Sequence, residues 1–291
     1  MGRFKRGFGS WFLFLGLLGG VSAAHAEAPV WALKGAKNTV YLAGSVHLLP
    51  ASDSTLPAAF NKAYADSSAL VMEIDLHDMG SLDPTSLLSS GMSEDEPLSE
   101  VIGKARFEKL AKQFETLGVP TEILESLQPW MAAMTLEQLQ LVKLGFDPNS
   151  GVEMQLQAHA DADHKQITGL ETITEQLGLL SGLSRADQIK FLDLTLEEMQ
   201  EAKGQTGALL KAWRAGDAQK LAGMLSEEYG AAPGLYATLI SDRNRRWVPE
   251  IEKLLKADKN YMVVVGTLHI VGRNGLLDLL KSDGFTARQL Q

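Results

Sequence analysis

The chain has 291 residues, no cysteine and a formal net charge of −9 at neutral pH. Disulfides, thiol nucleophiles and thiolate metal sites are therefore excluded, so any metal ion must be held by His, Asp or Glu. An acidic chain without a long basic run is also a poor candidate for binding nucleic acid.

The first residues have the composition of a secretion signal. Arg3, Lys5 and Arg6 precede an apolar run over 11–21, and Ala24-His25-Ala26 matches the pattern after which a signal peptidase cuts. The sequence thus predicts a cleavable signal peptide over residues 1–26 and a periplasmic or secreted protein, residues 27–291. The alternative is an uncleaved membrane anchor. No second long apolar segment follows, so we expect no membrane association after cleavage.

The remaining chain alternates short apolar runs with longer amphipathic segments. In chain order, the pattern first predicts strands over 29–34 and 39–43, a helix over 56–67, a strand over 69–75 and a loop over 76–97. It then predicts a helical segment that ends near 118, helices over 129–144 and 152–163, and a strand over 166–170. The last part has predicted helices over 184–203, 217–229 and 236–255, a buried strand over 261–265, a helix over 275–281 and an edge strand over 285–290. Strands separated by helices indicate an α/β fold. Residues 98–160 look like a helical insertion, and no linker marks a second domain.

A short motif occurs twice, once near each end of the mature chain. Val40–Ala43 leads into Gly44-Ser45-Val46-His47, and Tyr261–Val265 leads into Gly266-Thr267-Leu268-His269. Ligands of open α/β sheets bind where strands end at their carboxyl edge, so two neighbouring strands of this kind would place both histidines in one crevice. The alternative is that each histidine only hydrogen-bonds local backbone at the end of a buried strand.

Glu73 adds a carboxylate to this pair. It lies in the apolar run Ala69–Asp75, where burial is costly unless the charge is paired or bound to a cation. Two imidazoles and a carboxylate suit Mn, Co, Fe or Zn, so His47, Glu73 and His269 are candidate metal ligands. The alternative for Glu73 is a salt bridge. Asp75 and His77 form a reserve ligand set.

These residues carry a resemblance to the TraB/PrgY/GumN family, which is related to the TIKI metalloproteases and more distantly to erythromycin esterases and haem-binding ChaN proteins. The similar pieces are both Gly-x-x-His motifs, Glu73, Gly145–Pro148, Gly169–Thr172, Glu175-Gln176, Trp213–Asp217 and Asp242–Asn244. The resemblance implies a single α/β domain with a mixed, mostly parallel sheet in two related halves. It also implies a site in which Glu171 and Arg243 are catalytic groups beside His47, Glu73 and His269.

Read from the residues alone, Glu171 could act as a general base, or it could be an acid at a helix N-terminus. Arg243 could hold a substrate carboxylate or stabilise an oxyanion, whereas Arg245 and Arg246 are expected on a solvated helix face. His159 and His164 are expected at the surface.

Two functions follow as expectations. The first is an exported hydrolase in which a divalent metal (Mn, Co or Zn) activates water, acting in particular on peptide bonds, with a peptide or small-molecule substrate. The second is a non-catalytic protein of the same fold that binds haem, a metal or a small ligand.

Overall fold

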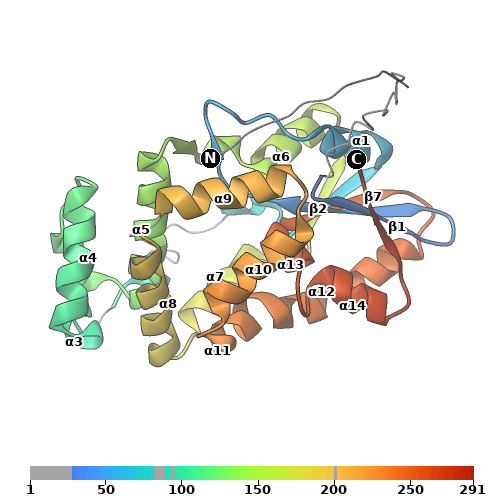
Figure 1. Ribbon diagram of the computed structural model, residues 1–291. Coiled ribbons are helices and arrows are strands. Elements are labelled where there is room, and N and C mark those ends of the chain that lie inside the picture. Colours follow the sequence, from blue (N-terminus) through green and yellow to red (C-terminus); the bar gives the residue numbers. More distant parts are fainter. Residues whose placement is uncertain (1–27, 82–88, 94–95, 200–201) are drawn as a thin grey trace, which may run out of the picture.

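A computed structural model describes residues 28–81, 89–93, 96–199 and 202–291. The predicted signal peptide, residues 1–26, lies outside the described residues. Within them, one six-stranded sheet lies between two layers of helices, and a group of helices extends to one side (Figure 1).

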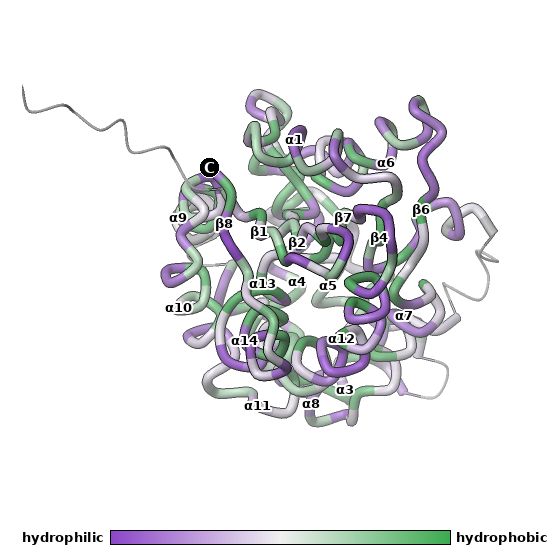
Figure 2. Tube along the Cα trace, turned by 90° about the vertical axis from the view of Figure 1, so that its right-hand side faces the viewer, coloured by the Kyte–Doolittle hydropathy of each residue, from purple (hydrophilic) through white to green (hydrophobic). Residues whose placement is uncertain are grey.

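The sheet is mixed and mostly parallel. Its strands are β1 (Val30–Lys34), β2 (Thr39–Ser45), β4 (Ala69–Met72), β6 (Gln166–Gly169), β7 (Tyr261–Gly266) and β8 (Ala287–Gln289). Their spatial order is β6-β4-β7-β2-β1-β8, which Figure 2 shows across the centre of the molecule. The four strands β6, β4, β7 and β2 run parallel to one another, whereas β1 pairs antiparallel with both β2 and β8.

The central strands are apolar on both faces, as expected for a parallel sheet that helices cover on each side. In β7, the four residues Met262–Val265 are buried. Helices α1 (Ala58–Asp66) and α6 (Val152–Ala162) cover one face, and α12 (Asp242–Leu255) and α14 (Leu276–Ser282) cover the other (Figures 1 and 2). Side chains from all these elements form one hydrophobic core.

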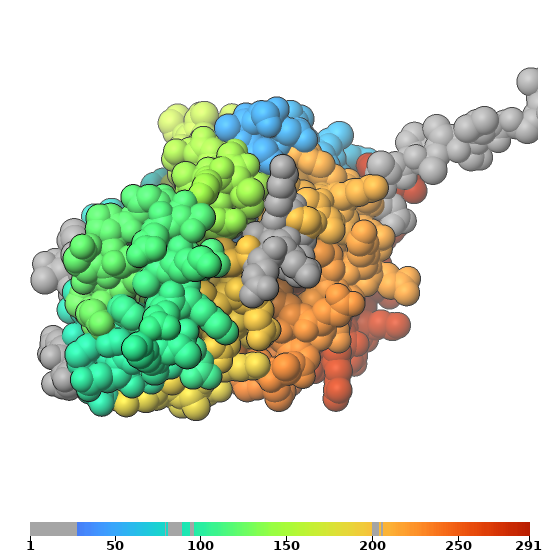
Figure 3. All heavy atoms as spheres, turned by 60° about the vertical axis from the view of Figure 1, so that its left-hand side comes forward, coloured from blue at the N-terminus to red at the C-terminus, as the bar shows by residue number. Residues whose placement is uncertain are grey.

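A second core lies beside the sheet domain. It joins α3 (Leu98–Ile102), α4 (Lys104–Thr116), α5 (Pro129–Lys143) and α8 (Arg185–Glu198), which we call the helical lobe. In the space-filling view of Figure 3, the green surface of this lobe stands beside the orange surface of α9 (Ala202–Arg214) and α10 (Ala218–Tyr229). A hydrogen bond connects helix α9 with strand β2 of the sheet: Trp213 Nε1 donates to the carbonyl of Gly44 at 2.7 Å.

Shorter elements complete the described chain. They are β3 (Leu49–Pro50), which pairs with β5 (Phe146–Asp147), the helices α7 (Ile173–Ser181), α11 (Pro233–Tyr236) and α13 (Thr267–Ile270), the 3-10 helices η1 (Leu76–Ser81), η2 (Glu122–Ser126) and η3 (Pro148–Ser150), and the π-helical turn η4 (Ala237–Ser241). Throughout the part of the chain that the structure describes, no helix is both long and apolar enough to cross a bilayer.

The predicted fold class is confirmed: the chain is α/β, with a mixed and mostly parallel sheet. Several details differ from the sequence prediction. Helices α7 and α9 were not predicted, and the helix expected over 184–203 ends at Glu198. The strand expected over 69–75 ends at Met72, which leaves Glu73 just beyond the sheet rather than inside it.

Candidate active site at the carboxyl edge of the sheet

Four parallel strands end in a row of chemically active side chains. Along the sheet edge, β6 is followed by Glu171, β4 by Glu73, β7 by His269 and β2 by His47. Because parallel strands share one carboxyl edge, residues from four distant parts of the chain meet there. The sheet register continues past the strands, since Glu171 N donates to the Glu73 carbonyl at 2.9 Å.

Arg243 lies at the centre of this row. Its Nη2 atom is 2.5 Å from Glu73 Oε2 and also donates to Glu171 Oε1, while Nε is 3.3 Å from Glu171 Oε2. All three side chains are at least nine-tenths buried. The turn η4 presents Arg243 to the site at the start of α12, and the Leu239 carbonyl of that turn accepts from Nη1 at 3.1 Å. The guanidinium thus neutralises charge that burial would otherwise make costly.

His269 is held from both sides of its ring. Nε2 lies 2.9 Å from Arg243 Nη1, and Nδ1 lies 2.8 Å from Asn244 Oδ1. Asn244 is fully buried, and its amide nitrogen donates to the carbonyls of His269 and Asn274. Trp247 packs on the ring with a centroid separation of 4.7 Å. Burial lowers the pKa of His269 to about 4, helped by the positive charge of Arg243 and against the opposite effect of Glu73, so the ring is neutral at physiological pH.

Glu73 is an ionised carboxylate in this setting. Burial alone would raise its pKa, but interactions with His269, Arg243 and His47, together with the N–H of Gly266, lower it to about 2. Gly266 N donates to Glu73 Oε1 at 2.7 Å, and Gln176 Nε2 contacts both Glu73 and Glu171.

His47 joins the row at the β2 end but has its own partner. Its Nδ1 atom is 2.8 Å from Glu153 Oε1, and its side chain is 68% exposed. The charge of Glu153 raises the pKa of His47 above its ordinary value, despite the opposing effect of desolvation. Glu73 contributes to this increase, so His47 interacts electrostatically with the buried cluster.

Three acids of the neighbouring helices are linked electrostatically with His47 or with one another: Glu137 in α5, Glu198 in α8 and Glu228 in α10. Glu137 interacts electrostatically with His47 and with the other two acids. Burial and the neighbouring carboxylates raise the pKa of Glu198 to about 7 and that of Glu228 to about 8. No local sequence pattern indicates these acids, because their helices come together only in the folded chain.

The structure brings Glu73, Glu171, Arg243 and His269 into direct contact and places His47 at the same edge. Glu153, Asn244 and Gln176 were not predicted as site residues. The reserve residues Asp75 and His77 pair with each other, and the His77 ring lies 2.8 Å from Asp75 and 3.0 Å from Asp161. His159 is exposed and contacts the Tyr64 ring.

The predicted metal ligands have the right chemistry for Mn, Co or Zn but the wrong arrangement. Glu73 Oε1 and His269 Nε2 are 4.0 Å apart, and Arg243 contacts both side chains, so its guanidinium takes the position of a shared cation. His47 is engaged by Glu153. Among the described side chains, no group of three His, Asp or Glu is arranged to hold an ion. As arranged, these residues do not fit the metal, and its presence stays a prediction.

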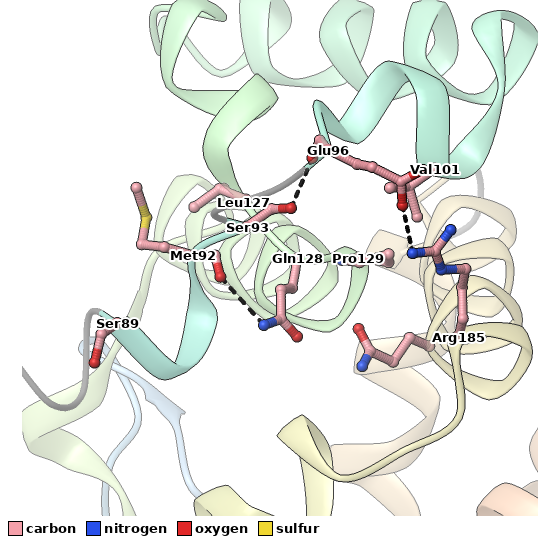
Figure 4. Close-up of a pocket in the computed structure, with 10 residues that line it drawn as sticks. Ser89, Met92, Ser93, Glu96, Val101, Leu127, Gln128, Pro129 and Arg185 are labelled. Atoms are coloured by element: carbon pink, nitrogen blue, oxygen red, sulfur yellow. Dashed lines mark hydrogen bonds and ion pairs between the residues drawn. The ribbon is translucent and has the colours of Figure 1, made fainter.

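A cavity of about 420 Å³ lies elsewhere, between α3, the start of α5 and the start of α8. Figure 4 shows Gln128, Ser93 and Leu127 around it, with Glu96 and Arg185 forming an ion pair. It contains none of the five predicted site residues.

Comparison with known proteins agrees with the resemblance noted in the sequence. The TraB/PrgY/gumN family matches residues 29–289. The proteins named "Uncharacterized protein YbaP" from Escherichia coli (strain K12) and Shigella flexneri are each 25% identical over 241 residues, which is 83% of this chain and 87% of theirs. No solved structure matches. The chain therefore belongs to the TraB/PrgY/gumN family.

Proposed function

We propose that this protein is an exported hydrolase that cleaves peptide bonds or chemically related amide and ester bonds. The observation that carries the proposal is the row of Glu171, Glu73, His269 and His47 at the ends of four adjacent parallel strands, with Arg243 buried among them. Buried titratable groups with strongly shifted pKa values gather at functional sites more often than elsewhere.

The groups in the row have complementary chemistry. His47, with its raised pKa and exposed ring, can donate a proton to a leaving group. Glu73 is ionised and can accept a hydrogen bond from an attacking water. Arg243 holds both carboxylates in place, because its Nε and Nη2 donors all go to Glu73 and Glu171. His269 is neutral and supports the guanidinium through Nε2.

The export part of the proposal is supported by the basic start, the apolar run and the Ala24-His25-Ala26 sequence. N-terminal sequencing of the protein from its native host tests it. We expect the mature chain to begin at Glu27. A mature chain that begins at Met1 would contradict the signal peptide.

Hydrolysis is tested with purified residues 27–291 and a quenched-fluorescence peptide library, with and without added Mn²⁺, Co²⁺ or Zn²⁺. We expect turnover that falls at least about 100-fold in His47→Ala and in His269→Ala. Glu250→Gln, on the exposed side of α12, is the matched control. Absence of turnover under every condition, or turnover unchanged by both histidine variants, would contradict the proposal.

The divalent metal is tested by calorimetry with each metal chloride alone. If Glu73 and His269 bind the ion, then Arg243 must withdraw, and His269→Gln should abolish stoichiometric binding while Glu250→Gln preserves it. Binding that survives His269→Gln would place the metal elsewhere. A haem titration on the same samples addresses the binding-protein alternative.

A further inference from the structure

Glu153 connects two residues of the first Gly-x-x-His motif. Its Oε1 atom accepts a hydrogen bond from the Ser45 hydroxyl and lies 2.8 Å from His47 Nδ1. The Glu153 side chain is only 14% exposed, whereas the His47 ring is mostly exposed. Because a carboxylate only accepts hydrogen bonds, His47 Nδ1 must carry the hydrogen.

The backbone is built for this contact. Helix α6 begins directly against the motif, since Val152 N donates to the Val46 carbonyl at 3.1 Å. At Gly151, an added Cβ would lie 2.1 Å from the carbonyl oxygen of His47, so only glycine permits the approach. The approach brings Glu153, in the first turn of α6, to the His47 ring.

None of the described residues hydrogen-bonds to the other ring nitrogen, Nε2, or forms an ion pair with it, and the His47 side chain is 68% exposed. A carboxylate that fixes one imidazole nitrogen sets the ring orientation and the role of the other nitrogen, both in proton transfer and in metal ligation.

We propose that Glu153 is a positioning residue for His47 that holds the ring so that Nε2 is presented to the substrate. The inference rests on the proposed function, because it assigns His47 as the group that meets the substrate. It does not depend on a metal, since the same orientation presents Nε2 to a leaving group or to an ion.

The test compares Glu153→Leu, Glu153→Gln and Glu250→Gln with the wild type. In peptide cleavage, we expect Glu153→Leu to lower kcat about 10–100-fold with KM changed less than about 3-fold. Glu153→Gln retains an acceptor oxygen and should recover part of this loss. Glu250→Gln should match the wild type.

A second readout does not need activity. In protein labelled with ¹⁵N-histidine, long-range ¹H–¹⁵N spectra should show a hydrogen-bonded Nδ1–H on His47, identified by its loss in His47→Gln. The signal should vanish in Glu153→Leu and persist in Glu250→Gln.

The two readouts separate the possible failures. An Nδ1–H signal unchanged by Glu153→Leu would overturn the positioning role, whatever the activity. A Glu153→Leu enzyme with wild-type kcat would also overturn it. If the wild type cleaves nothing, the proposed function fails, while loss of the signal in Glu153→Leu would still support the positioning of His47. Should Glu153→Leu fail to fold, Glu153→Ala, which also lacks the acceptor, takes its place in both readouts.

Discussion

The guanidinium of Arg243 donates through Nη1 to Nε2 of His269 across 2.9 Å. A guanidinium has no acceptor, so Nε2 must carry the lone pair, and Nδ1 carries the hydrogen that goes to Asn244. The contact therefore fixes the neutral tautomer of His269. It also joins the second Gly-x-x-His motif to both buried glutamates through one side chain.

Replacement of Arg243 should destabilise the fold strongly. Arg243→Met removes the one guanidinium that contacts both Glu73 and Glu171, and leaves only Arg246 Nη2, 3.9 Å from Glu171 Oε2; loss of one partner of a buried pair costs about 3–5 kcal/mol. Urea unfolding followed by circular dichroism measures the loss. Arg245→Met is the control, because Arg245 is half exposed and pairs only locally. A loss below about 1 kcal/mol for Arg243→Met would show that the buried cluster is not held by this charge.

Two glycine substitutions should have opposite effects. In Gly151→Ala, the new methyl group meets the backbone of His47, so we expect a loss of about 1–3 kcal/mol from overpacking. Gly223→Ala, inside α10 with no atom within 4 Å of the added Cβ, should instead stabilise the helix by about 0.5–1 kcal/mol. Both changes are measured by urea unfolding. Equal stabilities for the two variants would contradict the close contact of α6 with the His47 motif.

The protein should lose stability as the pH rises from about 5 to about 8. Burial raises the pKa of Glu228 to about 8, so between its ordinary pKa and pH 8 the folded chain keeps a proton that the unfolded chain has released. Over that window the folded state becomes less stable with increasing pH. Glu228→Gln removes this effect and should raise Tm at pH 8.5 by about 2–4 °C, with little change at pH 5. A Tm difference that is the same at both pH values would rule out a raised pKa at Glu228.

The sequence supplied much of the fold and the identities of the main site residues. The alternation of apolar runs with amphipathic segments predicted the α/β class, because buried strands and half-buried helices differ in period. The repeated Gly-x-x-His motif indicated His47 and His269, and the charge within an apolar run indicated Glu73. Glu171 and Arg243 came from the family resemblance, since their own sequence contexts allowed ordinary surface roles.

The rest depends on contacts that no local pattern encodes. Glu153 lies in the first turn of α6, where an acid is common for helix stability alone, and only packing places it on His47. The position of Arg243 between Glu73 and His269 follows from how α12 packs on the sheet, so the sequence could not indicate that a guanidinium takes the place expected for a metal.

The central claim is that both Gly-x-x-His motifs serve one hydrolytic site, and a double-mutant cycle tests it most directly. The measurement is kcat/KM for peptide cleavage by the wild type, His47→Gln, His269→Gln and the double variant. Residues that act as a unit are not additive, so we predict that the double variant is no more than about 3-fold slower than the slower single variant. Losses that multiply, or a wild type without turnover, would contradict the claim.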